Sequence, residues 1–233
     1  MIQPNIIVSI SGLPKTGKTH FSLTFPEPIK VYSFDLGADF VASKFPKKTI
    51  EVHNFTLPIV ESESTKWALP IWEEFYAEYK RDIDGGKFKT VVLDTATAVE
   101  SILRQSTLEE LRQDKPGKQK LATNEYVARN LRMTTLFARP RVAGMNLVTI
   151  QYLREQWLKS KNSDRAEPTG ELVLEGWNQT EGQADIIIEM TTAIKGGKTI
   201  MVSTIKSNRF DRDLNGKSFD DTDHTELMAL LGV

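Results

Sequence analysis

Short apolar runs alternate with longer amphipathic segments along the chain, and this alternation predicts its secondary structure. Residues 5–10 (NIIVSI) are rich in β-branched side chains and end at a Ser-Gly pair, which predicts a buried strand. The same reasoning predicts strands over residues 30–34, 49–55, 90–93 and 146–152. Apolar residues recur at helical spacing over 67–82, and further helices are expected over residues 18–23, 99–111, 124–138 and 222–231.

Two further segments complete the pattern. Residues 185–190 and 199–205 flank the sequence Lys-Gly-Gly-Lys, which is typical of a β-hairpin turn. Residues 154–170 are polar and without a period, so we expect a long loop there. Because strands alternate with helices, we predict a three-layer α/β fold with a mostly parallel sheet and antiparallel strands at its C-terminal edge. No linker divides the chain, so we expect a single domain over residues 1–233.

The composition excludes several classes of protein. Hydrophobic residues make up 39% and charged residues 26% of the 233 positions, which is ordinary for a globular chain with a sizeable core. The net charge of -1 provides no overall field for nucleic acid or membranes, so binding a polyanion would need a local patch. Cysteine is absent, which excludes disulfides and thiolate metal sites and suits a reducing cytoplasm. The first residues lack a basic region and a long apolar stretch, so we expect neither a signal peptide nor a membrane span.

The motif that carries the chemistry follows the first predicted strand. Eight residues match the phosphate-binding pattern G-x-x-x-x-G-K-S/T, and they are Gly12, Leu13, Pro14, Lys15, Thr16, Gly17, Lys18 and Thr19. The two glycines let the backbone turn so that successive N–H groups face phosphate oxygens at the start of a helix. Lys18 would supply charge to the β- and γ-phosphates, and the Thr19 hydroxyl would ligate Mg²⁺. The pattern predicts a site for ATP and Mg²⁺ that includes His20; the alternative is a glycine-rich turn with a surface lysine.

Two strand ends supply further candidate residues. Asp94 ends the apolar run TVVLD, where a carboxylate would hold the metal with support from Thr95. The alternative is that Asp94 caps the helix that follows. Thr149 and Gln151 place polar groups at the end of the run NLVTIQY. Gln151 would sense the γ-phosphate or orient the attacking water, unless it is only a polar residue at a strand end.

With these segments in order, the chain resembles the RecA-like branch of P-loop ATPases. It looks most similar to short phage-encoded, AAA-type nucleotide-binding proteins that are associated with recombination and single-stranded DNA. The resemblance extends from about residue 4 to about residue 212 and is most specific at GLPKTGKT. It implies that another strand lies between the phosphate-loop strand and the Asp94 strand. It also implies a homo-oligomeric ring or filament in the cytoplasm, that of the host if the protein is phage-encoded.

The same resemblance points to cations after the last long strand. Related ATPases place Lys or Arg side chains there that reach the γ-phosphate of a neighbouring subunit. The matching residues are Lys206 and Arg209, with Arg212 as a further candidate. A cation that arrives from a neighbour would tie hydrolysis to assembly, whereas the alternative is a solvated basic turn.

One departure from the family concerns the group that activates water. RecA-like ATPases place a glutamate just past the second strand, and Gly37 occupies that position here. Asp35 or Asp39 would take the role with a shorter reach. Otherwise hydrolysis would be slow, and nucleotide binding would act mainly as a switch.

Two basic segments correspond to the loops that touch single-stranded DNA in the RecA family. The residues expected to contact DNA are Lys115, Lys118, Lys120, Arg154, Trp157, Lys159, Lys161 and Arg165. Cations would bind the phosphate backbone, and the tryptophan would stack on a base. The alternative for both segments is ordinary solvated surface.

Three functions therefore compete. The first is an oligomeric, recombination-type ATPase that acts on single-stranded DNA. The second is an ATP-dependent switch or loader that recruits a DNA-processing partner with little hydrolysis, which Gly37 favours. The third is a small-molecule phosphotransferase, but the chain offers no compact Arg cluster for a lid over the acceptor.

Overall fold

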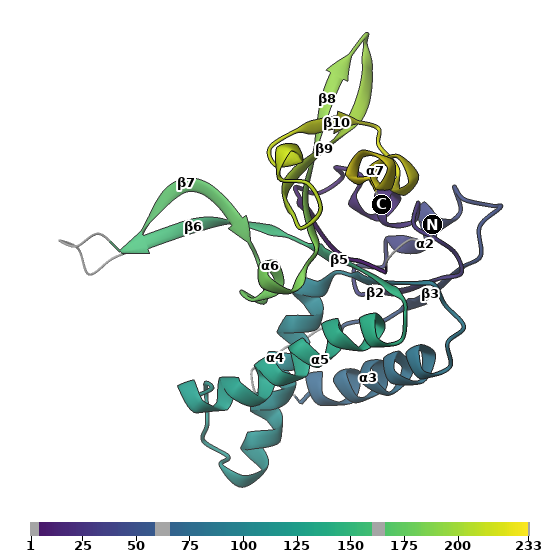
Figure 1. Ribbon diagram of the computed structural model, residues 1–233. Coiled ribbons are helices and arrows are strands. Elements are labelled where there is room, and N and C mark those ends of the chain that lie inside the picture. The colour runs from purple at the N-terminus through teal and green to yellow at the C-terminus, as the bar shows by residue number, and fades with distance from the viewer. Residues whose placement is uncertain (1–4, 59–65, 160–165, 233) are drawn as a thin grey trace.

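The fold is described from a computed structural model, which defines residues 5–58, 66–159 and 166–232. An eight-stranded sheet forms its centre, in the order β10-β9-β8-β1-β5-β4-β2-β3 (Figure 1). The strands are β1 (Ile7–Gly12), β2 (Ile29–Ser33), β3 (Ile50–Asn54), β4 (Thr90–Asp94), β5 (Asn146–Gln151), β8 (Ile186–Lys195), β9 (Lys198–Asn208) and β10 (Ser218–Asp220). The six strands from β8 to β3 are parallel, β9 pairs antiparallel with β8, and β10 pairs antiparallel with β9. Strand β5 lies between β1 and β4, so the implied strand order is confirmed.

Helices cover both faces of this sheet (Figure 1). One face carries α3 (Ala68–Asp84), α4 (Ala96–Asp114) and α5 (Tyr126–Val142), and the other carries α1 (Lys18–Ser22), α2 (Ala38–Ala42) and α7 (His224–Leu231). Successive residues of β4 point to opposite faces, because Leu93 packs in the core under α3–α5 and Val92 packs in the core under α1, α2 and α7. Both faces are buried, which explains why the central strands read as unbroken apolar runs. The predicted α/β three-layer architecture is therefore confirmed.

One segment contradicts its prediction. Residues 154–170, expected as a loop, contribute to an antiparallel ribbon of β6 (Leu153–Lys159) and β7 (Ala166–Leu174) that projects from the body (Figure 1). Residues 160–165 lie outside the described part of the chain. A ribbon that covers no core needs no apolar face, so its strands lack the alternation by which strands are predicted.

Several smaller features complete the fold. The expected hairpin joins β8 to β9 through Gly196 and Gly197, whose φ angles of 57° and 76° match a tight two-residue turn. Short elements that the pattern does not predict are α2, η1 (Thr123–Glu125), α6 (Thr180–Gln183), η2 (Arg212–Leu214) and β10. Among the described residues, no helix combines the length and apolar character needed to cross a membrane.

Candidate nucleotide site

The phosphate loop joins β1 to α1 at the carboxyl edge of the sheet, and two of its positions require glycine. Gly12 and Gly17 have φ angles of 150° and 91°, which side chains rarely tolerate. A Cβ on Gly12 would lie 2.2 Å from the carbonyl oxygen of Met190, and a Cβ on Gly17 would lie 2.2 Å from Met201 Sδ. The loop is therefore pressed against β8 and β9, where only glycine leaves room.

The loop also leaves its backbone donors without protein partners. Thr16 Oγ1 donates to the Leu13 carbonyl at 2.9 Å and closes the turn. Within the described residues, the N–H groups of Leu13, Lys15, Thr16 and Gly17 donate no hydrogen bond. A turn of unpaired N–H groups forms a concave site for an anion, as the motif predicts.

Lys18 is buried and folds back over this turn. Its Nζ donates to the carbonyl oxygens of Gly12 at 2.8 Å and Leu13 at 2.7 Å. Burial lowers the pKa of Lys18, and the carboxylates of Asp94 and Asp35 oppose that shift. A phosphate group would supply the counter-charge that this buried ammonium lacks.

The two predicted metal ligands meet at the end of β4. Thr19 Oγ1 donates to Asp94 Oδ2 at 2.8 Å. Asp94 is 1% exposed, and its Oδ1 has no hydrogen-bond partner within the described residues. The alternative role of Asp94 as a helix cap does not apply, because Thr95 caps α4 by accepting a hydrogen bond from the N–H of Ala98 at 3.1 Å.

The electrostatics of Asp94 indicate a missing positive charge. Burial first, and then the charge of Asp35, raise the pKa of Asp94 to about 7, while Thr19 and Lys18 oppose the rise. A divalent cation beside the carboxylate would stabilise its ionised form.

The residues present fit a magnesium ion. Hydroxyl and carboxylate oxygens are ligands that Mg²⁺ prefers, and the unpaired Oδ1 of Asp94 leaves a lone pair for the ion or its water shell. No three acidic or histidine side chains in the part of the chain that the structure describes gather to hold a metal by themselves. Mg²⁺ would therefore be held jointly by Thr19, Asp94 and the phosphates of a nucleotide.

A cavity of about 610 Å³ opens beside the loop. The predicted residues that line it are Pro14, Lys15, Gly17, Lys18, Thr19, His20, Asp35, Asp94 and Thr95. Sequence reasoning missed a second set, which comprises Phe40, Val41, Lys44, Ile150, Tyr152, Thr192, Thr199 and Met201. Most of the missed residues come from α2, a five-residue helix without a period, and from the β8–β9 hairpin, which extends past the end of β1. Only the tertiary fold brings them to the site.

One wall of this cavity combines aromatic rings with a cation. The His20 ring lies 4.9 Å from the ring of Phe45, and its Nδ1 is buried without a partner in the described chain. Burial and the nearby Lys44 lower the pKa of His20. Lys44 Nζ lies 4.9 Å above the ring of Phe40, whose exposed fraction is 73%. The neutral imidazole and the exposed ring suit the flat, uncharged part of a nucleotide better than its phosphates.

The two candidates for the missing glutamate lie in different places. Asp35 lines the cavity, and its Oδ1 accepts a hydrogen bond from the N–H of Gly37 at 3.1 Å. Asp39 does not line it and instead accepts a hydrogen bond from Asn54 Nδ2. The fold therefore brings only Asp35 to the cavity.

Gln151 is not brought into the cavity, contrary to the role expected of it. Its Oε1 accepts a hydrogen bond from Ser9 Oγ at 2.8 Å. Its Nε2 lies 3.3 Å from the Glu175 carbonyl oxygen and 3.4 Å from Thr180 Oγ1. Thr149 is also buried, with its Oγ1 3.5 Å from the Val8 carbonyl oxygen. The geometry favours the alternative, in which both are polar residues that join neighbouring elements.

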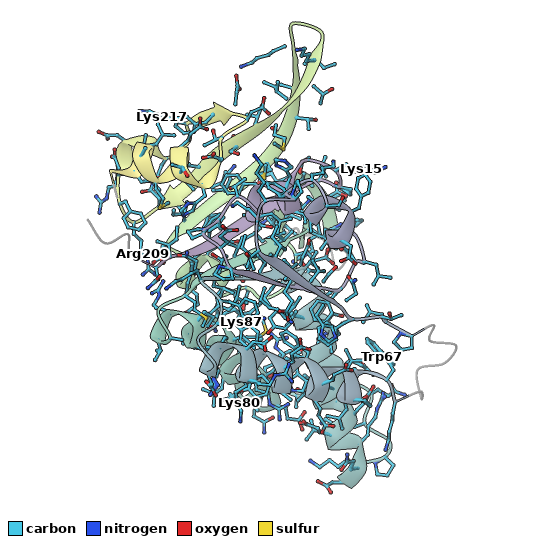
Figure 2. The ribbon with its side chains drawn as sticks, turned by 90° about the vertical axis from the view of Figure 1, so that its right-hand side faces the viewer. Lys15, Trp67, Lys80, Lys87, Arg209 and Lys217 are labelled. Atoms are coloured by element: carbon cyan, nitrogen blue, oxygen red, sulfur yellow. The ribbon has the colours of Figure 1, made fainter. Side chains whose placement is uncertain are left out.

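The predicted trans-acting cations both contact carboxylates, and Arg209 also lies away from its own phosphate loop. Lys206 Nζ lies 3.0 Å from Glu189 Oε2, and Arg209 contacts Asp185 at 3.3 Å. Arg209 follows β9 at the end of the sheet where strand β1 begins. The phosphate loop lies at the opposite end of the sheet, where β1 ends. Lys15 and Arg209 accordingly lie on opposite flanks in Figure 2. Arg212 is exposed at the start of η2.

The predicted DNA contacts fall on two separate surfaces. Lys115 and Lys120 are exposed between α4 and η1, but Lys118 Nζ lies 2.8 Å from Glu125 Oε2. Arg154 and Trp157 are exposed on β6, and Lys159 ends that strand. Lys161 and Arg165 lie outside the described residues. The α4–α5 connection and the β6–β7 ribbon lie apart in Figure 1, so the fold does not join them into one surface.

The sheet order, the phosphate loop and the Thr19–Asp94 pair define a P-loop ATPase-like domain of RecA-like fold. Comparison with known families assigns it further: residues 4–214 match a family profile described as an AAA domain (AAA_24), and the chain belongs to that family. Among solved structures, the fold is similar to that of a KaiC-like protein from the hyperthermophilic archaeon Pyrococcus horikoshii OT3. That similarity has a TM-score of 0.52 at 13% identity and covers 92% of this chain and 84% of the other. No curated protein sequence matches the chain.

Proposed function

We propose that the chain binds Mg-ATP at the phosphate loop and hydrolyses it. The contact between Thr19 Oγ1 and Asp94 Oδ2 carries this proposal, because the fold brings together groups that are 75 positions apart in the sequence. Beside them, the buried ammonium of Lys18 donates hydrogen bonds to two carbonyl oxygens. A hydroxyl, an uncompensated carboxylate and an ammonium are complementary to a magnesium-bound triphosphate. When bound, Mg²⁺ would neutralise charge on the phosphates.

Calorimetric titration of ATP in the presence and absence of Mg²⁺ tests the proposal. Lys18→Ala should weaken ATP binding roughly 10- to 100-fold, because a charge-assisted hydrogen bond is lost. Asp94→Asn should reduce the effect of Mg²⁺ on affinity. Lys47→Ala serves as the control, since Lys47 is exposed and does not line the cavity. Equal ATP affinity of Lys18→Ala and the parent chain would contradict the proposal.

For hydrolysis, we propose that Asp35 orients the attacking water. It is the cavity carboxylate other than Asp94, which is assigned to the metal. Asp35 is shorter than the glutamate of related ATPases, so turnover should be slow. An ATP-dependent switch that recruits a DNA-processing partner is the second candidate function, and Gly37 at the glutamate position favours it.

We further propose that the active form is a homo-oligomer, in which Lys206 and Arg209 serve the nucleotide of a neighbour. Arg209 supports this, because it lies on the flank opposite its own loop and its side chain is 52% exposed. The mass of the particle, measured with and without ATP and a short DNA oligomer, tests assembly. Arg209→Ala should lower turnover and leave ATP affinity unchanged, since the arginine does not reach its own cavity.

For the substrate, we propose single-stranded DNA bound along the β6–β7 ribbon in recombination or replication. Trp157 is 54% exposed on β6, which also carries exposed Arg154. An exposed aromatic ring beside a cation suits a base next to a phosphate. Trp157→Ala should weaken binding of a fluorescent oligothymidine roughly tenfold. Lys118, which pairs with Glu125, should contribute less than the exposed Lys115 and Lys120.

Turnover measurements separate the three functions. Stimulation of ATP turnover by oligothymidine supports the DNA-dependent ATPase. Tight Mg-ATP binding with negligible turnover supports the switch. Transfer of phosphate to a nucleoside monophosphate would support a phosphotransferase and contradict both of the others.

A further inference from the structure

Tyr152 occupies the single position between β5 and β6, where it forms part of two cavities. One is the nucleotide cavity of about 610 Å³. The other is a cavity of about 410 Å³ between the start of α4, Trp67 and Gly176. Among the residues described, Tyr152 is the one that lines both. The Tyr152 side chain therefore lies where the two cavities meet.

The backbone of Tyr152 is tied to both strands of the ribbon and to α4. Its N–H donates to Thr97 Oγ1 at 3.1 Å, and its carbonyl accepts from the N–H of Glu175 at 2.9 Å. Thr97 Oγ1 in turn lies 3.1 Å from the Glu175 carbonyl oxygen. Leu153 begins β6, and Glu175 directly follows β7. These hydrogen bonds therefore hold the base of the ribbon, where its two strands leave the body of the protein. Thr97 lies three residues after Asp94, which links the base of the ribbon to the proposed metal site.

Tyr152 lines the nucleotide cavity, and its hydroxyl is an available hydrogen-bond donor. Burial, followed by the charges of Asp35, Asp94 and Glu175, raises the pKa of Tyr152, so the hydroxyl keeps its proton at neutral pH. It makes no hydrogen bond to any residue that the structure describes. The side chain of Gln151, by contrast, already has three partners. Tyr152 is thus the better placed of the two to respond to a bound phosphate.

We infer that Tyr152 donates a hydrogen bond to the terminal phosphate of bound nucleotide and couples it to the β6–β7 ribbon. This inference rests on the proposed function, since it assigns a residue to the same nucleotide site. Its hydroxyl distinguishes a triphosphate from a diphosphate, because only the triphosphate carries the terminal phosphate to which it would donate. A ligand that moves the ribbon moves Tyr152 through Thr97 and Glu175 and so changes turnover.

The first test compares affinities for a non-hydrolysable ATP analogue and for ADP, both with Mg²⁺, by calorimetry. Tyr152→Phe keeps the ring and removes the hydroxyl, so the preference for triphosphate should fall roughly tenfold while ADP affinity stays within about twofold. Tyr76→Phe is the matched control, because it removes a tyrosine hydroxyl from α3, away from the cavity. A purely structural role of Tyr152 would change both affinities together. An unchanged triphosphate preference in Tyr152→Phe would overturn the inference.

The second test concerns the coupling. Thr97→Val removes the hydroxyl that ties Tyr152 to Glu175 but retains the tyrosine hydroxyl itself. Thr97→Val should reduce the change in nucleotide affinity that oligothymidine causes. It should have a smaller effect on nucleotide affinity measured without oligothymidine. An undiminished oligothymidine effect would contradict the coupling. If the unmodified chain binds no Mg-nucleotide, the proposed function has failed. If it binds Mg-nucleotide but Tyr152→Phe leaves the triphosphate preference unchanged, only the inference about Tyr152 has failed.

Discussion

The two ends of the parallel sheet hold buried lysines whose charges are compensated to different degrees: Lys30 on β2 at the amino end, and Lys18 on α1 at the carboxyl end. At the amino end, Lys30 Nζ lies 2.6 Å from Glu51 Oε1 and 2.8 Å from Glu78 Oε1. At the carboxyl end, Lys18 forms no ion pair with any described residue and bonds to two carbonyls. Burial alone would lower the pKa of Lys30, but hydrogen bonds to Glu51 and Glu78 raise it, whereas burial prevails at Lys18 and lowers its pKa. A lysine compensated by the protein stabilises the fold; one left uncompensated indicates a site for an anionic ligand.

The largest expected effect comes from removing each lysine in turn. Lys30→Met should destabilise the protein by about 3–5 kcal/mol, because it removes the lysine that lies 2.8 Å from buried Glu78 and leaves Arg81 at 3.8 Å. Lys18→Met, the matched change, should alter the free energy of unfolding by only about 1 kcal/mol but weaken ATP binding roughly 10- to 100-fold. Urea unfolding and ATP titration of both variants measure this. Equal destabilisation by the two changes would remove the distinction between the two ends of the sheet.

A smaller effect should follow from the pH dependence of Asp94. Its folded-state pKa is raised to about 7, above the unfolded value of about 3.9. The unfolded chain therefore releases this proton first, and the nucleotide-free protein loses stability as pH rises from about 4 to about 7. Asp94→Asn should remove this pH-dependent loss, which is of order 1–3 kcal/mol in the free energy of unfolding between pH 5 and 7. Melting temperatures of both proteins between pH 5 and 8, without nucleotide, would show it; parallel curves would contradict it.

The smallest effect is expected at the compensated end. Hydrogen bonds from Lys30 and Lys87 lower the pKa of Glu51 to about 2. This stabilisation is present above the unfolded pKa of about 4.3 and is lost as pH falls towards 2. Because the Glu51 side chain is 45% exposed, Glu51→Gln should cost about 1 kcal/mol or less at neutral pH. Urea unfolding at pH 7 and pH 3 measures the difference, and a larger cost at pH 3 would contradict the sign.

Much of this fold follows from local sequence pattern, because a strand buried on both faces reads as an unbroken apolar run. Strand β4 and the phosphate loop are the clearest cases, and they also supply Lys18, Thr19 and Asp94. The strand order was predicted only from the family resemblance, because no short segment of sequence indicates that β5 lies between β1 and β4. The ribbon escaped prediction because strands that cover no core need no alternation.

The sequence predicted the charged residues of the site, in the phosphate loop and at the end of β4, but not the cavity residues from α2 and the β8–β9 hairpin. Fixed spacing predicts the phosphate loop, since its glycines have no space for a side chain. Phe40, Thr192 and Met201 have no such signal, because short α2 and the overhanging hairpin meet the loop only after folding. Tyr152 and Gln151 are neighbours in the sequence, and only the folded structure shows that Tyr152 lines the cavity whereas the side chain of Gln151 is hydrogen-bonded elsewhere.

The β8–β9 hairpin has a practical consequence for observing this protein. Its inner residues, Thr192 and Met201, line the nucleotide cavity, and Ile194 near its tip is 79% exposed. The natural chain contains no cysteine. Ile194→Cys would therefore provide a unique thiol for a fluorescent dye, so that movement of the cavity wall during each cycle could be followed without altering a residue that lines it.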